Sequence, residues 1–248
     1  TSRPVGDAMA TTIWGTSSSW TLTALPLFVW MGEILFRTKL SENLFKGLSP
    51  WMQKLPGGLI HVNVVGCALF AAISGSSAAT VATVGKMSIP ELRKRNYPEK
   101  ILLGSLAGSG TLGLLIPPSI ILIIYGVAVQ ESIAKLFIAG IIPGIMIALI
   151  FMSYVIIWSL INKKSMPKII EEYSFLEKIK RSKQLLPVII LILAVIGSIY
   201  TGIATATEAA SLGVVGALIL SYFQKSLTLK TFKSSLLGAT KTSCMIAF

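Results

Sequence analysis

Long apolar stretches alternate with short basic runs along this chain of 248 residues. A helix needs about 20 predominantly apolar residues to cross a bilayer. Five stretches come near or exceed that length: 22–36, 101–129, 136–161, 185–200 and 209–223. The pattern therefore predicts an all-α protein that spans a membrane several times.

Two further segments repeat apolar residues every three or four positions and carry charged residues between them. They are Leu40, Leu44, Leu48, Trp51 and Leu55 in the first segment, and Ile169, Tyr173, Leu176 and Ile179 in the second. This spacing predicts two amphipathic helices that lie at the membrane surface, with ordinary solvated loop helices as the alternative.

The basic residues set the expected orientation. The chain has 22 Lys and Arg against 10 Asp and Glu, and 13% of its residues are charged, whereas soluble domains carry about 25%. Four runs, at 37–54, 86–100, 163–183 and 225–241, hold 20 of the 22 basic residues. Because these runs are short and separated by neutral stretches, they indicate cytoplasmic loops of a membrane protein and not a nucleic-acid-binding surface.

One neutral stretch does not fit a simple crossing. Residues 55–85 lie between Lys54 and Lys86, which both belong on the cytoplasmic side, and these 31 residues are too few for two crossings of about 20 residues each. The stretch is therefore predicted to enter and leave on one face as a re-entrant helical hairpin. Its middle, Ile73 to Thr80, is rich in small and hydroxyl residues, as a turn inside a membrane requires.

The stretch 101–129 contains a second interruption. A glycine-rich part is followed by Pro117-Pro118, and two prolines are expected to split the span into half-helices near residues 112–119. A broken helix frees backbone carbonyls, which together with serine and threonine oxygens suit a hard cation such as Na⁺. The positive N-terminal end of the second half-helix suits a substrate carboxylate.

Small residues at helical spacing can also serve only to pack helices closely. We assign Gly104, Ala107 and Gly108 to packing. We assign Ser74, Ser76 and the break from Gly113 to Pro118 to binding, because close packing does not require a double proline beside a cluster of hydroxyls. This arrangement is typical of the midplane binding site of a secondary transporter.

The remaining polar residues are weaker candidates for a direct role in binding. Glu208 follows a polar turn and is expected either to function directly or to begin a helix at the outer interface, and Glu33 is expected to pair with Arg37. His61 is expected at the hairpin entrance, and four tryptophans are expected to anchor the chain at the interface: Trp14, Trp20, Trp30 and Trp51.

Several functional classes are disfavoured by the sequence. Cys67 and Cys244 lie in apolar surroundings and fit neither a metal site nor a disulfide framework. No phosphate-binding loop and no nucleophile elbow is present. A membrane-embedded enzyme is therefore disfavoured and no cofactor is expected, while a passive channel remains the alternative to a transporter.

Five further segments are informative when each is taken as a whole: PLFVWMGEILFR at 26–37, LPGGLIHVNVVGCALFAAISGSSAATVATVG at 55–85, GSLAGSGTLGLLIPPSIILIIYG at 104–126, LFIAGIIPG at 136–144 and TEAASLGVVGAL at 207–218. These segments resemble the DctM-like large membrane subunit of tripartite ATP-independent periplasmic (TRAP) transporters. The resemblance covers nearly the whole chain.

The resemblance implies a bacterial or archaeal inner-membrane protein that imports organic acids, such as dicarboxylates or sialic acid, with Na⁺ as the coupling ion. It also implies two partners, a small four-helix DctQ-like membrane subunit and a periplasmic substrate-binding protein. The implied fold is an inverted-repeat, elevator-type transporter in which each repeat has a re-entrant hairpin and a discontinuous helix.

Carried over to this chain, the family-type Na⁺ site would use five residues: Ser74, Ser76, Gly113, Ile116 and Pro118. Ser77 and Thr80 would be neighbours that face the substrate cavity. The implied organisation is a scaffold span with an arm helix at 1–56, a transport region at 57–162, a cytoplasmic connector at 163–184 and the start of a second repeat at 185–248. Within the transport region the hairpin would cover 57–85, the broken helix 101–129 and a span 136–161. The chain is therefore expected to be part of a longer protein.

Overall fold

The computed structural model describes residues 5–18, 20–38, 40–167, 173–183 and 185–247. All regular elements in these residues are helices. The α-helices are α1 Val5–Ser17, α2 Ala24–Phe36, α3 Leu40–Met52, α4 Ile60–Ser74, α5 Ser77–Lys94, α6 Glu99–Gly110, α7 Ile120–Ala128, α8 Ile133–Ile161, α9 Phe175–Ser182, α10 Leu186–Tyr200, α11 Ala206–Phe223 and α12 Leu229–Ala247. The prediction of an all-α protein is confirmed for this part of the chain, while Ile169 of the predicted connector helix lies outside the described residues.

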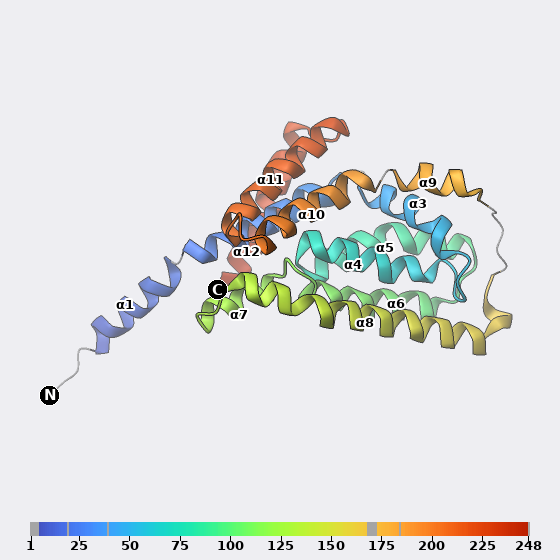
Figure 1. Cartoon of the computed structure of the whole chain (residues 1–248), viewed down its shortest axis with the longest axis horizontal. Coiled ribbons are helices and arrows are strands. Elements are labelled where there is room, and N and C mark those ends of the chain that lie inside the picture. The colour runs from blue at the N-terminus through green and yellow to red at the C-terminus, as the bar shows by residue number, and fades with distance from the viewer. Residues whose placement is uncertain (1–4, 19, 39, 168–172, 184, 248) are drawn as a thin grey trace.

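The helices form two neighbouring groups. Helices α4, α5, α6 and α8 pack alongside one another and form the hairpin group (Figure 1). In the α2 group, α2 packs with α11 and α12, and α10 lies against α11. Helix α1 projects away from both groups. The groups meet where α2 contacts α4 and α7, and large side chains such as Phe28, Phe70 and Phe137 are fully buried in the shared core. Helix α2 therefore connects the hairpin group to the rest of the protein.

Helices α4 and α5 form an antiparallel hairpin with a short tip. Helix α4 ends at Ser74 and is capped by Gly75, whose φ of 60° is a left-handed conformation that glycine adopts without steric cost. Ser76 follows in an extended conformation, and its hydroxyl accepts a hydrogen bond from the amide of Ala79 as the N-cap of α5. The local sequence thus ends one helix and starts the next within two residues.

The second arm of the hairpin is longer than the sequence predicts. Helix α5 continues through Lys86 to Lys94, so the helical arm extends beyond Gly85, where the neutral stretch ends. Charged residues end an apolar stretch without ending a helix, and Arg93 and Lys94 interact favourably with the C-terminal end of the helix dipole.

The stretch 101–129 is interrupted where the two prolines predict. Helix α6 ends at Gly110, a 3₁₀ turn covers Thr111–Leu114, and α7 starts only at Ile120. Neither proline has an amide hydrogen for a helix hydrogen bond. The hydroxyl of Ser119 instead donates to the carbonyl of Leu114 at 2.5 Å and closes the interruption.

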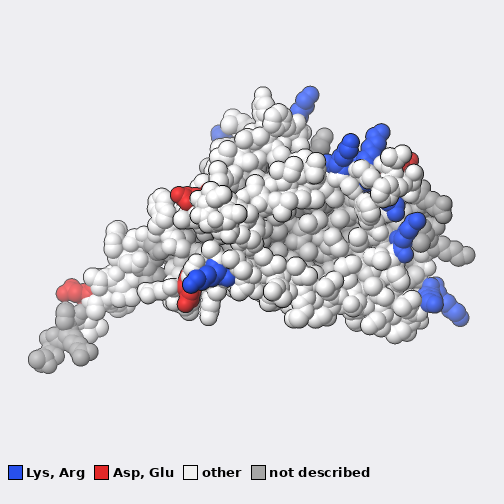
Figure 2. Space-filling view, viewed as in Figure 1, with Lys and Arg blue, Asp and Glu red and all other residues white. Residues whose placement is uncertain are grey.

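Two helices, α8 and α11, are each long and apolar enough to cross a membrane. Two bent helix pairs are also long and apolar enough when the two helices of each pair are taken together. They are Val5–Gly15 with Trp20–Phe36, and Phe175–Ser182 with Leu186–Tyr200. Only 17% of the apolar window of α8 is buried. On the face shown in Figure 2, most Lys and Arg gather at the end of the molecule near α3 and α9, and the broad middle is uncharged. These features describe a membrane protein of apolar helices.

Two of the four predicted interface tryptophans also join helices to each other. Trp51 of α3 donates from Nε1 to the hydroxyl of Ser182 at 2.8 Å, and the Lys178 ammonium lies over its ring. Trp30 of α2 donates to Ser235 of α12. The two predicted amphipathic helices α3 and α9 are thereby packed against each other, a contact that periodicity does not reveal.

The fold predicts which ends of the hairpin group share a side of the membrane. We expect single cysteines replacing Lys54 and Lys94, in a chain lacking Cys67 and Cys244, to react with an impermeant thiol reagent from the cytoplasmic side. A cysteine replacing Gln130, in the turn between α7 and α8, should react from the other side because α6, the break and α7 together lead across. Labelling of Lys54 and Lys94 variants from opposite sides would contradict the hairpin topology.

Candidate functional site

The hairpin tip and the helix break lie directly against each other. The amide of Ile120, at the start of α7, donates a hydrogen bond of 3.2 Å to the carbonyl of Gly75 in the tip. A Cβ atom on Gly113 would lie 2.8 Å from both the carbonyl carbon of Ser76 and the amide nitrogen of Ser77. A Cβ atom on Gly75 would lie 2.6 Å from the carbonyl oxygen of Pro118. Only glycine permits this backbone approach, so the two interruptions form one unit.

Hydroxyl groups gather on the tip side of this contact. Ser74 and Thr80 are buried, and their hydroxyl oxygens lie 2.9 Å apart. The Ser74 hydroxyl also lies 3.3 Å from the carbonyl oxygen of Ser76. The hydroxyl of Ser77 is buried and has no hydrogen-bond partner among the described residues, which is uncommon because buried polar groups are nearly always paired. The tip therefore offers at least one oxygen that is available to a ligand.

The break contributes backbone carbonyls. Those of Gly113, Ile116 and Pro118 accept no hydrogen bond from the part of the chain that the structure describes, as expected where a helix is interrupted. The amide of Ile116 donates to the carbonyl of Leu112 at 2.8 Å, and the side chain of Ile116 faces Gly144 on α8. The structure thus brings Ser74, Ser76, Ser77, Thr80, Gly113 and Pro118 together. Ile116 packs its side chain against α8, and its carbonyl, the group predicted to bind Na⁺, has no donor among the described residues.

Three glycines that the sequence analysis does not single out support this unit. A Cβ on Gly32 of α2 would lie 2.9 Å from Cα of Ser74, and a Cβ on Gly140 of α8 would lie 2.8 Å from the carbonyl oxygen of Leu115. Gly140 and Gly144 are spaced by four residues and both face the break, a spacing that permits close helix contact. That spacing is the signal from which the contact could have been predicted.

The assignment of Gly104 and Ala107 to packing is wrong within the described chain. A Cβ on Gly104 would meet no atom within 4 Å, and both residues are exposed. Gly108 is different, because a Cβ there would lie 3.2 Å from the ring of Phe151.

The other titratable candidates lie outside the contact between tip and break and have structural partners. Glu33 forms an ion pair with Arg37. Glu208 is exposed and accepts hydrogen bonds from the amide and hydroxyl of Thr205, so it caps α11. His61 is fully buried, and its Nε2 lies 2.8 Å from the carbonyl oxygen of Pro56. The described residues contain no group of three His, Cys, Asp or Glu side chains able to hold a metal ion.

This geometry can be set beside known proteins. The family model described as the DctM component of the tripartite ATP-independent periplasmic transporter matches residues 1–248. The chain belongs to the DctM family. The predicted family resemblance is confirmed.

Relatives of this DctM chain have several named substrates. It is 34% identical to the C4-dicarboxylate large permease of Pseudomonas aeruginosa, over 97% of this chain and 56% of the relative. It is 34% identical to the sialic acid permease SiaT of Haemophilus influenzae, over 92% and 37%. It is also 33% identical to the 2,3-diketo-L-gulonate large permease of Escherichia coli, over 97% and 56%. The chain spans about half the length of the curated relatives it matches.

The contact between tip and break predicts that alanine substitutions at two glycines of the same segment have different effects on stability. Gly113→Ala should destabilise the full-length protein by about 1–3 kcal/mol, because its methyl group meets backbone that cannot move aside. Gly104→Ala should be neutral or stabilising by about 0.5–1 kcal/mol, because its methyl group enters open space and alanine favours helix. Thermal unfolding in detergent measures both, and equal effects would contradict the close contact.

Proposed function

We propose that this chain forms the cation-binding half of a Na⁺-coupled transporter for organic acids. The observation that carries the proposal is the cluster of hydroxyl and carbonyl oxygens where the hairpin tip meets the broken helix, in which the carbonyls of Gly113, Ile116 and Pro118 have no donor among the described residues. Hard cations prefer such oxygen ligands, and transporters place coupling ions at unwound helix segments. Na⁺ is here a transported ion and not a resident cofactor.

The proposed Na⁺ ligands are the oxygens of Ser74 and Ser76 on the tip and the carbonyls of Gly113, Ile116 and Pro118 in the break. The carbonyls already lack donors among the described residues, so a cation would use them without breaking a hydrogen bond. The absence of a carboxylate from this set leaves the bound site positively charged, which favours an anionic substrate nearby.

The proposed substrate is a carboxylate. C4-dicarboxylates, sialic acid and 2,3-diketo-L-gulonate, which the names of relatives give, each carry a carboxylate. Of the two predicted substrate neighbours, Ser77 is the stronger candidate, because it begins α5 and its hydroxyl is unpartnered among the described residues. Thr80 is fully buried and its hydroxyl is paired with Ser74, so we assign it to supporting the cation ligand Ser74.

The proposed setting is the bacterial inner membrane, with a small membrane subunit and a periplasmic binding protein as partners. Support for the first partner comes from the isethionate permease of Oleidesulfovibrio alaskensis, which is named DctMQ. This relative is 33% identical over 97% of this chain and 38% of its own length.

We propose an elevator movement in which the hairpin group shifts against the α2 group. The contact of α2 with the tip at Gly32 and Ser74 would then change between states.

Removal of one proposed ligand should weaken Na⁺ coupling. In proteoliposomes holding the full-length protein and its partners, Ser74→Ala should raise the half-saturating Na⁺ concentration for C4-dicarboxylate uptake by about tenfold, the equivalent of about 1.4 kcal/mol. The matched control is Ser88→Ala on the same hairpin, because Ser88 is fully buried and its hydroxyl has no described partner. An unchanged Na⁺ dependence in Ser74→Ala would contradict the cation site.

The same assay separates the transporter from a passive channel. Uptake should saturate with substrate and vanish when K⁺ replaces Na⁺, because the coupling ion supplies the driving force. Uptake that is linear in substrate and indifferent to Na⁺ would indicate a channel.

A further inference from the structure

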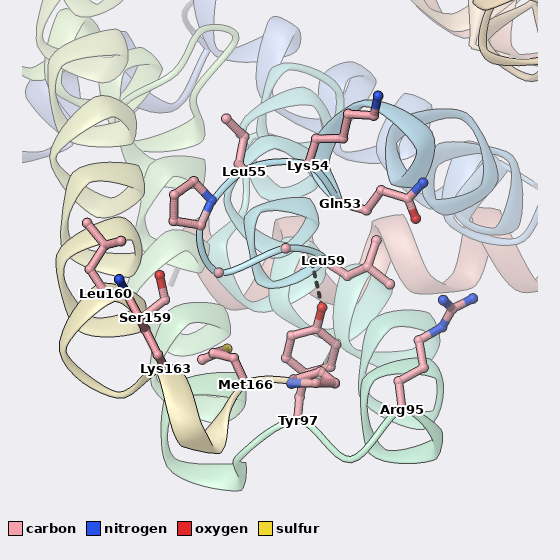
Figure 3. A pocket seen from close by; sticks show the side chains of 14 residues that line it. Gln53, Lys54, Leu55, Leu59, Arg95, Tyr97, Ser159, Leu160, Lys163 and Met166 are labelled. Carbon is pink, nitrogen blue, oxygen red and sulfur yellow. Dashed lines mark hydrogen bonds between the residues drawn. The ribbon is translucent and has the colours of Figure 1, made fainter. Parts of the chain in front are cut away.

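A pocket of about 470 Å³ lies at the root of the hairpin, away from the tip. We call it the root pocket and define it by Lys54, Tyr97, Arg95, Ser159, Lys163 and Met166 (Figure 3). These residues come from the loop after α3, the loop between α5 and α6, the end of α8 and the turn that follows α8. Three of the fourteen lining residues are basic and none is acidic.

We infer that the root pocket binds the phosphate head group of an anionic phospholipid from the cytoplasmic leaflet. This inference is independent of the proposed Na⁺ site, because the two places share no residue. The basic runs put this end of the hairpin on the cytoplasmic side, where anionic lipids attract basic groups next to membrane helices.

The charge of the root pocket favours a phosphate ester. Neither Lys54 nor Lys163 forms an ion pair with an acidic residue of the described ranges. Arg95 adds positive charge to the pocket although it already pairs with Glu91 at 3.9 Å. In Figure 3, Arg95 and Lys163 lie on opposite sides of Tyr97. An anion in the pocket would therefore have positive charge on two sides.

Tyr97 supplies a neutral hydrogen-bond donor. Its hydroxyl oxygen accepts the amide hydrogen of Leu59 at 3.0 Å (Figure 3), and its own hydrogen donates to no described residue. Burial raises the pKa of Tyr97, so the hydroxyl keeps its proton. A phosphate oxygen could accept that hydrogen bond.

The surface beside the root pocket favours a lipid over a soluble phosphate. The end of α8 lines the pocket through Ser159 and Leu160 and continues into an apolar surface on which Ile157 is 58% and Ile161 77% exposed. Lining residues Leu55, Leu59 and Met166 are also apolar. A molecule with an anionic head and an acyl chain matches both parts, whereas a free anion uses only the basic part.

The test measures lipid binding to the full-length protein in detergent. Phosphatidylglycerol, phosphatidylcholine with the same acyl chains, and inorganic phosphate are titrated in turn while the shift of the thermal unfolding temperature is recorded. Wild-type protein should be stabilised at lower concentrations of phosphatidylglycerol than of phosphatidylcholine. The double variant Lys54→Gln/Lys163→Gln should need about tenfold more phosphatidylglycerol.

Lys164→Gln is the matched control, because Lys164 is adjacent to Lys163 but lines a neighbouring cavity that contains Glu91. Its phosphatidylglycerol titration should match that of the wild type, and both variants should unfold at the wild-type temperature in phosphatidylcholine. Equal sensitivity to both lipids, or no loss in the double variant, would overturn the inference. Stabilisation by inorganic phosphate at the lipid concentration would show a soluble-anion site and would also overturn it.

Discussion

The contact between two interrupted helices is the constraint on which the rest of this structure depends. Backbone groups left open by a helix break or a hairpin tip are costly in apolar surroundings unless they find partners or a polar ligand. Here Ile120 donates to Gly75 across the contact, and Gly113 lets the break approach the backbone of Ser76 and Ser77. The break keeps open carbonyls at Gly113, Ile116 and Pro118, which we propose as cation ligands together with Ser74 and Ser76 of the tip. The same contact therefore gives some of the open backbone groups hydrogen-bond partners and keeps other oxygens free for the proposed binding site.

The surrounding helices hold this contact in place. Gly32 brings α2 against the tip, and Gly140 and Gly144 bring α8 against the break. Each of these contacts depends on the absence of a side chain. Because α2 also packs against α11 and α12, a shift of the hairpin group relative to α2 would change the surroundings of Ser74 directly. Such a link would couple the proposed elevator movement to the proposed cation site.

The sequence predicts the local features of this site better than its contacts. Pro117-Pro118 and the hydroxyl-rich tip predict an interruption in each segment, because proline, glycine and serine act on their own backbone. Gly32 could not be assigned to Ser74, since their contact depends on how two distant helices pack. The neutral stretch does not predict where α5 ends, because a membrane boundary does not end a helix. The spacing of Gly104 alone predicts a packing residue, yet Gly104 faces open space in the described chain.

Hydrogen–deuterium exchange on the full-length protein tests the central claim most directly, because it reports on the tip and the break separately without requiring transport. Amides in residues 74–80 and in residues 111–116 and 119 should both exchange more slowly when Na⁺ replaces K⁺ at equal ionic strength. Residues 159–166 at the end of α8 should be unaffected and serve as the internal control. Protection of only one of the two segments, or equal exchange in Na⁺ and K⁺, would contradict a cation site shared between the hairpin tip and the broken helix.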